Sequence, residues 1–209
     1  MHGLFVLQFW ESAMNDRLER FDHNASGCIT MGGKELFFKL KDMSLTGFLA
    51  ELDDNFFLKS KTECNAELAG LGCDIRFHIF SPEMSGIAKL VQVEPVRERL
   101  LIALQFSVIN FAAGFKVFKR CLPRKEMPLN GRLFWQDQCY DFKSEDVSLN
   151  GLSVKMASQC SVIGGELISI ELPRLCVSGS ARVKWLMPEA SRLGLAYSRL
   201  IYNREPNNQ

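Results

Sequence analysis

The sequence predicts a mainly β protein that contains two copies of one small fold. Three observations support this prediction. Apolar and polar residues alternate with a period of two in several segments, glycine and proline break these segments into short lengths, and one hexapeptide pattern occurs twice. Alternation with period two is typical of half-buried strands. Short strands separated by turns are typical of a β-sandwich or a small barrel.

The alternating segments are CDIRFHIF at 73–80, ELISIEL at 166–172 and VSGSARVKW at 177–185. In the first of them, Ile75 and Phe77 lie on the opposite face from Arg76 and His78. In the third, the alternation places Trp185 on the same face as Val177 and Val183. Helical pattern is sparse, so we expect only a few short helices.

The hexapeptide pattern Asp-x-Ser-Leu-x-Gly occurs as DMSLTG at residues 42–47 and as DVSLNG at residues 146–151. The two occurrences are 104 residues apart (146 minus 42), and the same offset relates Arg20 to Arg124. Each copy therefore has an arginine 22 residues before its aspartate (42 minus 20 and 146 minus 124). A match that includes a shared upstream arginine favours two copies of one fold over chance.

The boundary between the copies is expected at residue 112, which gives domains 1–112 and 113–209. The sequence AAGF provides a flexible point there, and the basic stretch KVFKRCLPRK follows it. After the hexapeptide glycine, the first copy runs on to a strand-like segment at 100–106 and the second to one at 193–200.

Composition is that of an ordinary globular protein, with 209 residues, 47% apolar residues and a net charge of +1. The near-zero charge argues against a general nucleic-acid partner, so any anion site has to be local. The apolar segment 1–10 lacks the features of a signal peptide, and the sequence contains no run of about 18 apolar residues that would span a membrane. The seven scattered cysteines form no C-x-x-C pair, which favours reduced thiols in the cytoplasm and neither disulfides nor a metal site. We expect no cofactor.

The residues that carry chemistry are concentrated in the second copy. Arg120 and Arg124 lie four residues apart and outside any alternating strand. Arginine binds phosphate oxygens and the O6/N7 edge of guanine with two parallel hydrogen bonds. Asp146 can accept from a base or brace an arginine, Ser148 offers a hydroxyl, and Gly151 allows a bend or a close approach. The hexapeptide also fits a plain β-turn with no ligand, an alternative that the sequence leaves open.

Arg-x-x-x-Arg followed by Asp-x-Ser-x-x-Gly resembles the PilZ family of bacterial cyclic di-GMP receptors. The resemblance covers residues 119–200 and includes GLSVKM after the motif glycine. It implies a six-stranded antiparallel barrel with a C-terminal helix. It also implies a cyclic di-GMP site whose residues are Arg120, Arg124, Asp146, Ser148 and Gly151. With the repeat, the expected fold becomes two PilZ-like barrels in tandem.

The first copy departs from the PilZ pattern. Arg20 occupies the position of the second arginine, but Asp16 stands at the position of the first and Arg17 comes one residue late. A one-residue shift turns the side chain to another direction, and Asp16 repels an anionic ligand. We therefore expect this half to keep the scaffold without the site.

These features predict a non-enzymatic, cytoplasmic receptor that changes the arrangement of its domains when cyclic di-GMP binds. Its output would be motility, pili, biofilm or exopolysaccharide control through an unidentified protein partner, and a homodimer is a further option. An enzyme is not expected because no paired acid and base, metal set or nucleophile motif occurs. The alternative is a ligand-free PilZ-like adaptor that acts through protein–protein contacts alone.

Overall fold

The computed structural model describes residues 25–31, 33–52, 74–81, 83–96, 99–112 and 124–203. Within these ranges, thirteen strands form one continuous sheet, and the helices are two single 3-10 turns, η2 (Pro173–Leu175) and η3 (Pro188–Ala190). The prediction of a mainly β protein is confirmed. The C-terminal helix that the PilZ resemblance implies is not found up to Asn203, where the described part of the chain ends.

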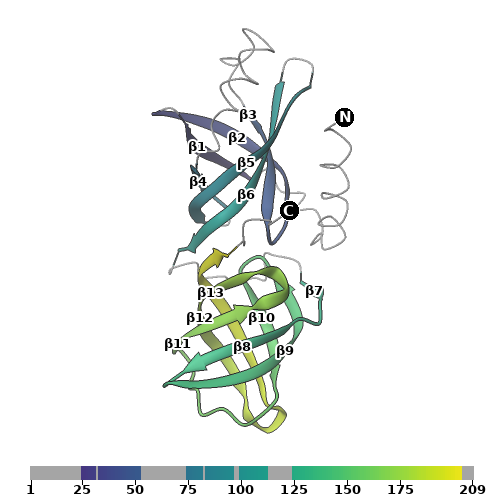
Figure 1. The fold of residues 1–209 in the computed structure, drawn as a ribbon, viewed down its shortest axis with the longest axis vertical. Helices are drawn as coiled ribbons and strands as arrows, with labels where there is room; N and C mark the ends of the chain where they lie inside the picture. Colours follow the sequence, from purple (N-terminus) through teal and green to yellow (C-terminus); the bar gives the residue numbers. More distant parts are fainter. Residues whose placement is uncertain are drawn as a thin grey trace, which may run out of the picture.

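The C-terminal half is a closed six-stranded antiparallel barrel (Figure 1). Its strands are β8 (Asn130–Trp135), β9 (Gln138–Ser148), β10 (Gly151–Met156), β11 (Leu167–Leu172), β12 (Val177–Met187) and β13 (Arg192–Tyr202). They pair in the order β8–β9–β10–β13–β12–β11, and β11 closes the ring on β8. The short strand β7 (Lys125–Glu126) adds to the ring by pairing with β9.

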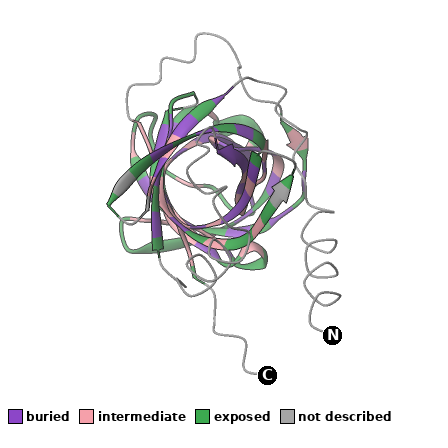
Figure 2. Ribbon diagram, turned by 90° about the horizontal axis from the view of Figure 1, so that it is seen from above, coloured by how far each residue is buried: buried purple, intermediate pink, exposed green. Residues whose placement is uncertain are grey.

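The N-terminal half pairs its strands in a matching order. These strands are β1 (Ser26–Met31), β2 (Lys34–Met43), β3 (Gly47–Leu52), β4 (Asp74–Ile79), β5 (Met84–Val96) and β6 (Arg99–Phe111). The pairings run β1–β2–β3–β6–β5–β4, and β4 pairs with β1. Figure 2, which is turned by 90° from Figure 1, shows the strands arranged around a ring, with buried and exposed positions following one another along them.

Irregularities recur at the same places in both halves. The β2–β3 ladder shifts at Lys41, and the β9–β10 ladder shifts at Glu145. These two bulge residues are separated by the offset of the hexapeptides, 104 (145 minus 41). A bulge re-aims the neighbouring side chains, so Glu145 and Asp146 are both partly exposed although they are consecutive in a strand.

Alternation predicted most of the buried face of β12 correctly. Val177, Ala181 and Val183 are buried as expected. Trp185 is 36% exposed, so the prediction that it shares the face of Val177 and Val183 was wrong. The β12–β13 ladder shifts between Val183 and Trp185, which leaves Lys184 as an extra residue and breaks the period of two.

The two halves are joined by strand pairing between β6 and β13, which meet at the centre of Figure 1. Ile109 pairs with Leu200 at the middle of this short ladder. On one side of it, the rings of Phe106 and Tyr202 lie 6.0 Å apart, and on the other side those of Phe111 and Tyr197 lie 5.9 Å apart. Each residue of β6 named here differs by 91 from its counterpart in β13 (197 minus 106, 200 minus 109, 202 minus 111). The junction is therefore approximately two-fold symmetric.

Candidate functional site

The hexapeptide DVSLNG forms the turn between β9 and β10. Ser148 is 1% exposed, and its hydroxyl lies 3.0 Å from the carbonyl oxygen of Gly151 and 2.9 Å from Oδ1 of Asn150. A serine hydroxyl carries one donor, which these two oxygens share. The side chain of Leu149 points into the core and is 4% exposed. Ser148 therefore closes its own hairpin.

Gly151 is required by a close approach of two backbones. A Cβ atom at this position would lie 2.1 Å from the carbonyl oxygen of Leu195 on β13. Gly151 pairs with Ala196 at this point, where β10 leaves the turn. The glycine therefore allows β13 to close against β10, and the predicted alternatives of a bend or a ligand approach are not needed to explain it.

DMSLTG uses the same construction in the first half. The hydroxyl of Ser44 donates to the carbonyl oxygen of Gly47 over 3.3 Å. A Cβ atom at Gly47 would lie 2.3 Å from the carbonyl oxygen of Leu104. The serine and the glycine of the repeat are thus accounted for by the hairpin in both halves, and ligand contact by Ser148 and Gly151 stays a prediction.

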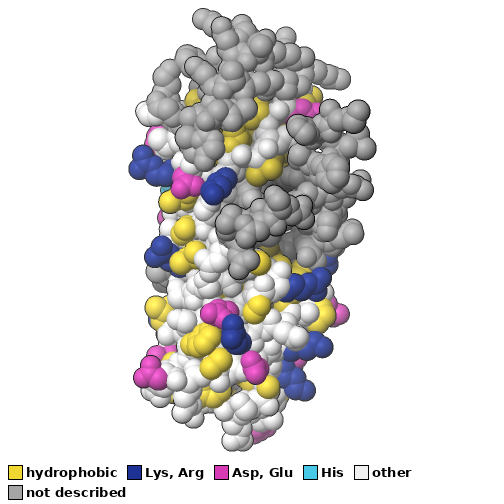
Figure 3. Space-filling view, viewed as in Figure 1, with side chains coloured by type: hydrophobic (Ala, Val, Ile, Leu, Met, Phe, Trp, Pro, Cys, Tyr) yellow, Lys and Arg dark blue, Asp and Glu magenta, His cyan; other side chains and the backbone are white. Residues whose placement is uncertain are grey.

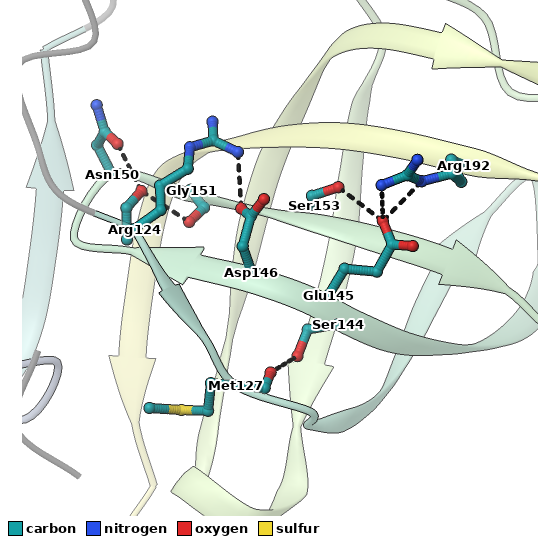
Figure 4. A network of polar contacts seen from close by, with 10 residues as sticks. Arg124, Met127, Ser144, Glu145, Asp146, Asn150, Gly151, Ser153 and Arg192 are labelled. Carbon is teal, nitrogen blue, oxygen red and sulfur yellow. Dashed lines mark hydrogen bonds and ion pairs between the residues drawn. The ribbon is translucent and has the colours of Figure 1, made fainter.

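Arg124 and Asp146 lie together although 22 residues separate them. The guanidinium NH1 donates to Oδ1 of Asp146 over 2.7 Å, and the two side chains are 35% and 30% exposed (Figure 4). Strand β7 fixes this meeting, because Glu126 pairs with Asp146 and Lys125 with Val147. Of the two roles open to Asp146, the structure has it brace an arginine. A guanidinium has five N–H donors, so others remain available for a ligand.

A buried serine anchors the segment that follows β7. Ser144 is 2% exposed, its hydroxyl donates to the carbonyl oxygen of Met127, and it accepts from the amide of Leu129 over 2.8 Å (Figure 4). The amide of Ser144 in turn donates to the carbonyl oxygen of Leu129 over 2.8 Å. These bonds hold the chain between β7 and β8 against β9. They thereby fix the position of β7, which Arg124 directly precedes.

A second ion pair lies beside the first on the same face of the barrel (Figure 4). Nε and NH2 of Arg192 lie 2.7 and 2.6 Å from Oε2 of Glu145, and the hydroxyl of Ser153 donates to the same oxygen over 3.2 Å. Ser153 is the register partner of Asp146, so the two pairs are neighbours on the sheet. Sequence reasoning missed this pair because the bulge at Glu145 cannot be read from the alternation.

Four predicted residues lie outside the described part of the chain. They are Arg120 of the second copy and Asp16, Arg17 and Arg20 of the first. The structure places Arg124 directly before β7, Asp146 and Ser148 on β9, and Gly151 at the start of β10. The role of Arg120 stays a prediction.

Three further findings concern a hollow in this half and the described residues as a whole. A hollow of about 680 Å³ is lined by residues that include Lys143, Glu145 and Lys155, but not Arg124 or Asp146. In the described ranges, no group of three histidine, cysteine or acidic residues is arranged to hold a metal ion. No helix among the described residues is both long and apolar enough to span a membrane.

The face drawn in Figure 3 carries interspersed basic and acidic side chains, with no broad basic area among the residues it describes.

No known family model matches the sequence, and no curated protein is similar to it. Among solved structures, the chain is similar to PlzA of Borreliella burgdorferi in complex with c-di-GMP, at 13% identity over 93% of each chain with a TM-score of 0.38. It is also similar to the inhibitor of motility MotI/DgrA of Bacillus subtilis, at 15% identity over 87% of this chain and 89% of that one, with a TM-score of 0.32. A third similar structure is YcgR of Escherichia coli in complex with c-di-GMP, at 15% identity over 92% and 80%, with a TM-score of 0.29. These likenesses are distant, so a functional assignment rests on the chain's own residues.

Proposed function

We propose that this chain is a non-enzymatic receptor for cyclic di-GMP, and that the ligand binds on the β9–β10 face of the C-terminal barrel. The observation that carries the proposal is the meeting of Arg124 and Asp146 over the motif hairpin, at 2.7 Å. An aspartate that orients an exposed arginine prepares a guanidinium for an incoming anion. Arg120, four residues upstream, supplies the second guanidinium.

Cyclic di-GMP matches these groups chemically. It carries two phosphates, which take arginine as a bidentate donor, and two guanines, whose O6 and N7 take arginine in the same way. Arg120 and Arg124 bind guanine and phosphate, while Asp146 orients the guanidinium of Arg124. Ser148 and Gly151 shape the hairpin beneath the ligand.

We further propose that the N-terminal half is a second PilZ-like barrel, with domains at 1–112 and 113–209, and that it has lost the site. The matching pairing orders and the recurring bulges at Lys41 and Glu145 support a common origin. Asp16 places a negative charge where Arg120 stands in the second copy.

In this proposal, the effect of ligand binding passes from the C-terminal half to the N-terminal half through the β6–β13 junction. Ligand binding changes the arrangement of the halves, and thereby the surface presented to a protein partner or to a second copy of the chain. Such a shift requires that the ligand bind the two arrangements with different affinity. The proximity of the hairpin to β13, through the pairing of Gly151 with Ala196, supports this route.

Calorimetric titration with cyclic di-GMP tests the proposal. The wild-type protein should bind, and Arg124→Ala and Arg120→Ala should each weaken binding by about 1–3 kcal/mol, roughly tenfold or more. Arg132→Ala is the matched control, because Arg132 also pairs with a carboxylate at 2.7 Å, that of Glu171, away from the site.

Unchanged affinity in both arginine variants would remove the assigned site. Absence of binding by the wild-type protein would favour the alternative, a ligand-free adaptor.

A further inference from the structure

The Arg192–Glu145 pair is held more firmly than an ordinary surface ion pair. One oxygen, Oε2 of Glu145, receives Nε and NH2 of Arg192 at 2.7 and 2.6 Å and the hydroxyl of Ser153 at 3.2 Å. Ser153 is 2% exposed, so it fixes the carboxylate from beneath, whereas the side chain of Arg192 is 40% exposed. Neither bond to the carboxylate uses NH1 of Arg192, so the donors of NH1 can meet an incoming anion.

The first half shows that the fold does not need the polar triad of Glu145, Ser153 and Arg192. Their counterparts, at an offset of 104 for the first two and 91 for the third, are Lys41, Leu49 and Leu101 (145 minus 41, 153 minus 49, 192 minus 101). The serine and the glycine of the hexapeptide, by contrast, occur in both halves. The half that lacks the upstream arginine pattern therefore lacks the polar triad as well, which separates the triad from the scaffold.

A lysine beside the polar triad has no carboxylate partner. In the first half, Lys41 pairs across the strands with Glu51 at 2.8 Å. The counterparts at the offset of 104, Glu145 and Lys155, carry the same two charges in exchanged order and could form the same pair. Arg192 engages Glu145 instead, and Lys155 forms no ion pair within the part of the chain that the structure describes.

Lys155 lies in the middle of a row of three cations. Its register partners are Lys143 on β9 and Arg192 on β13. Like charges directly opposite each other on neighbouring strands destabilise a sheet. The equivalent row of the first half consists of Lys39, Glu51 and Leu101. The second half therefore has cations where the first half has an acid and an apolar residue, although this arrangement costs stability.

A hollow of about 680 Å³ lies beside this row. Lys143 and Lys155 both line it, and the acidic residues of its described lining are Glu145 and Asp141. Glu145 is already engaged by the other two residues of the polar triad, so Asp141 alone is left to balance two lysines. The hollow thus offers room and a net positive charge to an anionic group.

The geometry points to a second phosphate-binding subsite, formed by Arg192 and the two lysines of the row, on the face that carries Arg124. Asp146 on β9 and Arg192 on β13 are separated by β10, and two inter-strand steps amount to about 10 Å. NH1 of Arg192 binds the phosphate, and the lysines compensate its charge. This inference rests on the proposed function. The phosphate is supplied by the cyclic di-GMP molecule at Arg124 or by a second one.

Calorimetric titration of Arg192→Ala and Lys155→Glu with cyclic di-GMP tests the inference. Arg192→Ala should bind about tenfold or more weakly than the wild type, the effect of losing a hydrogen bond to a charged group. Lys155→Glu introduces the charge that Glu51 has in the first half, and it should also bind more weakly. Arg132→Ala is the matched control, because it too breaks an arginine–glutamate pair of 2.7 Å, with Glu171, and it should bind like the wild type.

Salt dependence separates ligand contact from a structural role. Salt screens exposed charges, so the affinity of the wild type should fall between about 0.05 and 0.5 M NaCl. Arg192→Ala should lose less affinity over this range, and Arg132→Ala should lose as much as the wild type. Arg192→Lys keeps the charge without the planar donor fork, so its affinity should lie between those of the wild type and Arg192→Ala.

The stoichiometry of the same titrations identifies the source of the phosphate. One ligand per chain, with Arg124→Ala and Arg192→Ala both impaired, would indicate that a single molecule contacts both arginines. Two ligands per wild-type chain and one per Arg192→Ala chain would indicate a second molecule. Either result supports the subsite.

Three outcomes would overturn the inference. Wild-type affinity and salt dependence in Arg192→Ala, with Arg124→Ala impaired, would remove the subsite and leave the receptor proposal intact. Equal losses in Arg192→Ala and Arg132→Ala would also remove it, because the loss would then follow from breaking an ion pair. Failure of the wild-type protein to bind would instead overturn the proposed function, and the inference with it.

Discussion

Gly151→Ala should destabilise the C-terminal barrel. The new Cβ would lie 2.1 Å from the carbonyl oxygen of Leu195, which is 0.9 Å inside 3.0 Å, the limit that Cβ atoms essentially always respect. The atom it meets is backbone, so a whole strand has to move by about that amount. Overpacking of this kind costs about 1–3 kcal/mol. With an m-value of about 2 kcal/mol/M in urea, the unfolding midpoint should fall by about 0.5–1.5 M.

Urea unfolding followed by circular dichroism measures this change. Gly47→Ala is the parallel variant in the first half, with a contact of 2.3 Å to the carbonyl oxygen of Leu104, and its midpoint should also fall. Gly164→Ala is the control, because its Cβ would meet only Leu186 Cδ1 at 3.8 Å, an ordinary contact.

The hairpin explanation of the motif glycine would be refuted by a Gly151→Ala protein that unfolds at the wild-type midpoint. If that protein also failed to bind cyclic di-GMP, the glycine would serve the approach of the ligand and not the closure of β10 on β13.

Three further variants test the polar groups that hold each half. Ser148→Ala should lower the free energy of unfolding by about 1 kcal/mol, because it removes the donor that closes the hairpin. Ser44→Ala should lower it by less, because the bond of Ser44 to Gly47 is longer, 3.3 Å against 3.0 Å. Equal losses in denaturant unfolding would contradict this ranking. Lys41, hydrogen-bonded to Glu51, lowers the pKa of that carboxyl against the opposing effect of burial, and Arg99 also lowers it. The pairing of Glu51 should therefore stabilise the fold above the unfolded pKa of about 4.3 and be lost as pH falls through the lower folded pKa. Melting curves of wild type and Glu51→Gln between pH 7 and 3 should converge toward acid, and a gap independent of pH would exclude this role.

The strands could be predicted from the sequence because one side of the sheet faces the core and the other faces solvent. Ile168 and Ile170 alternate with polar neighbours and are buried, as the period of two requires. Trp185 could not be placed, because the bulge at Lys184 shifts the register and leaves no mark in the pattern. Each hexapeptide forms a turn between two paired strands, which agrees with the β-turn that the sequence left open. Its serine closes the hairpin and its glycine allows two strands to approach closely. From the sequence alone, these roles could not be distinguished from ligand binding.

The tyrosines at the junction were missed for a different reason. Their contacts depend on how β6 and β13 meet, and this is a long-range pairing. One signal was available in the sequence: ALQFSVINF at 103–111 aligns with GLAYSRLIY at 194–202 at an offset of 91. In that alignment Phe106 corresponds to Tyr197 and Phe111 to Tyr202, so each of these two positions gains a hydroxyl in the second half.

A crystal structure of the protein with cyclic di-GMP would test the central claim most directly. The ligand should lie on the β9–β10 face, with Arg124 in contact with its phosphate or guanine and withdrawn from Asp146. A ligand bound to the N-terminal half, or one bound elsewhere with the 2.7 Å pair of Arg124 and Asp146 intact, would contradict the claim.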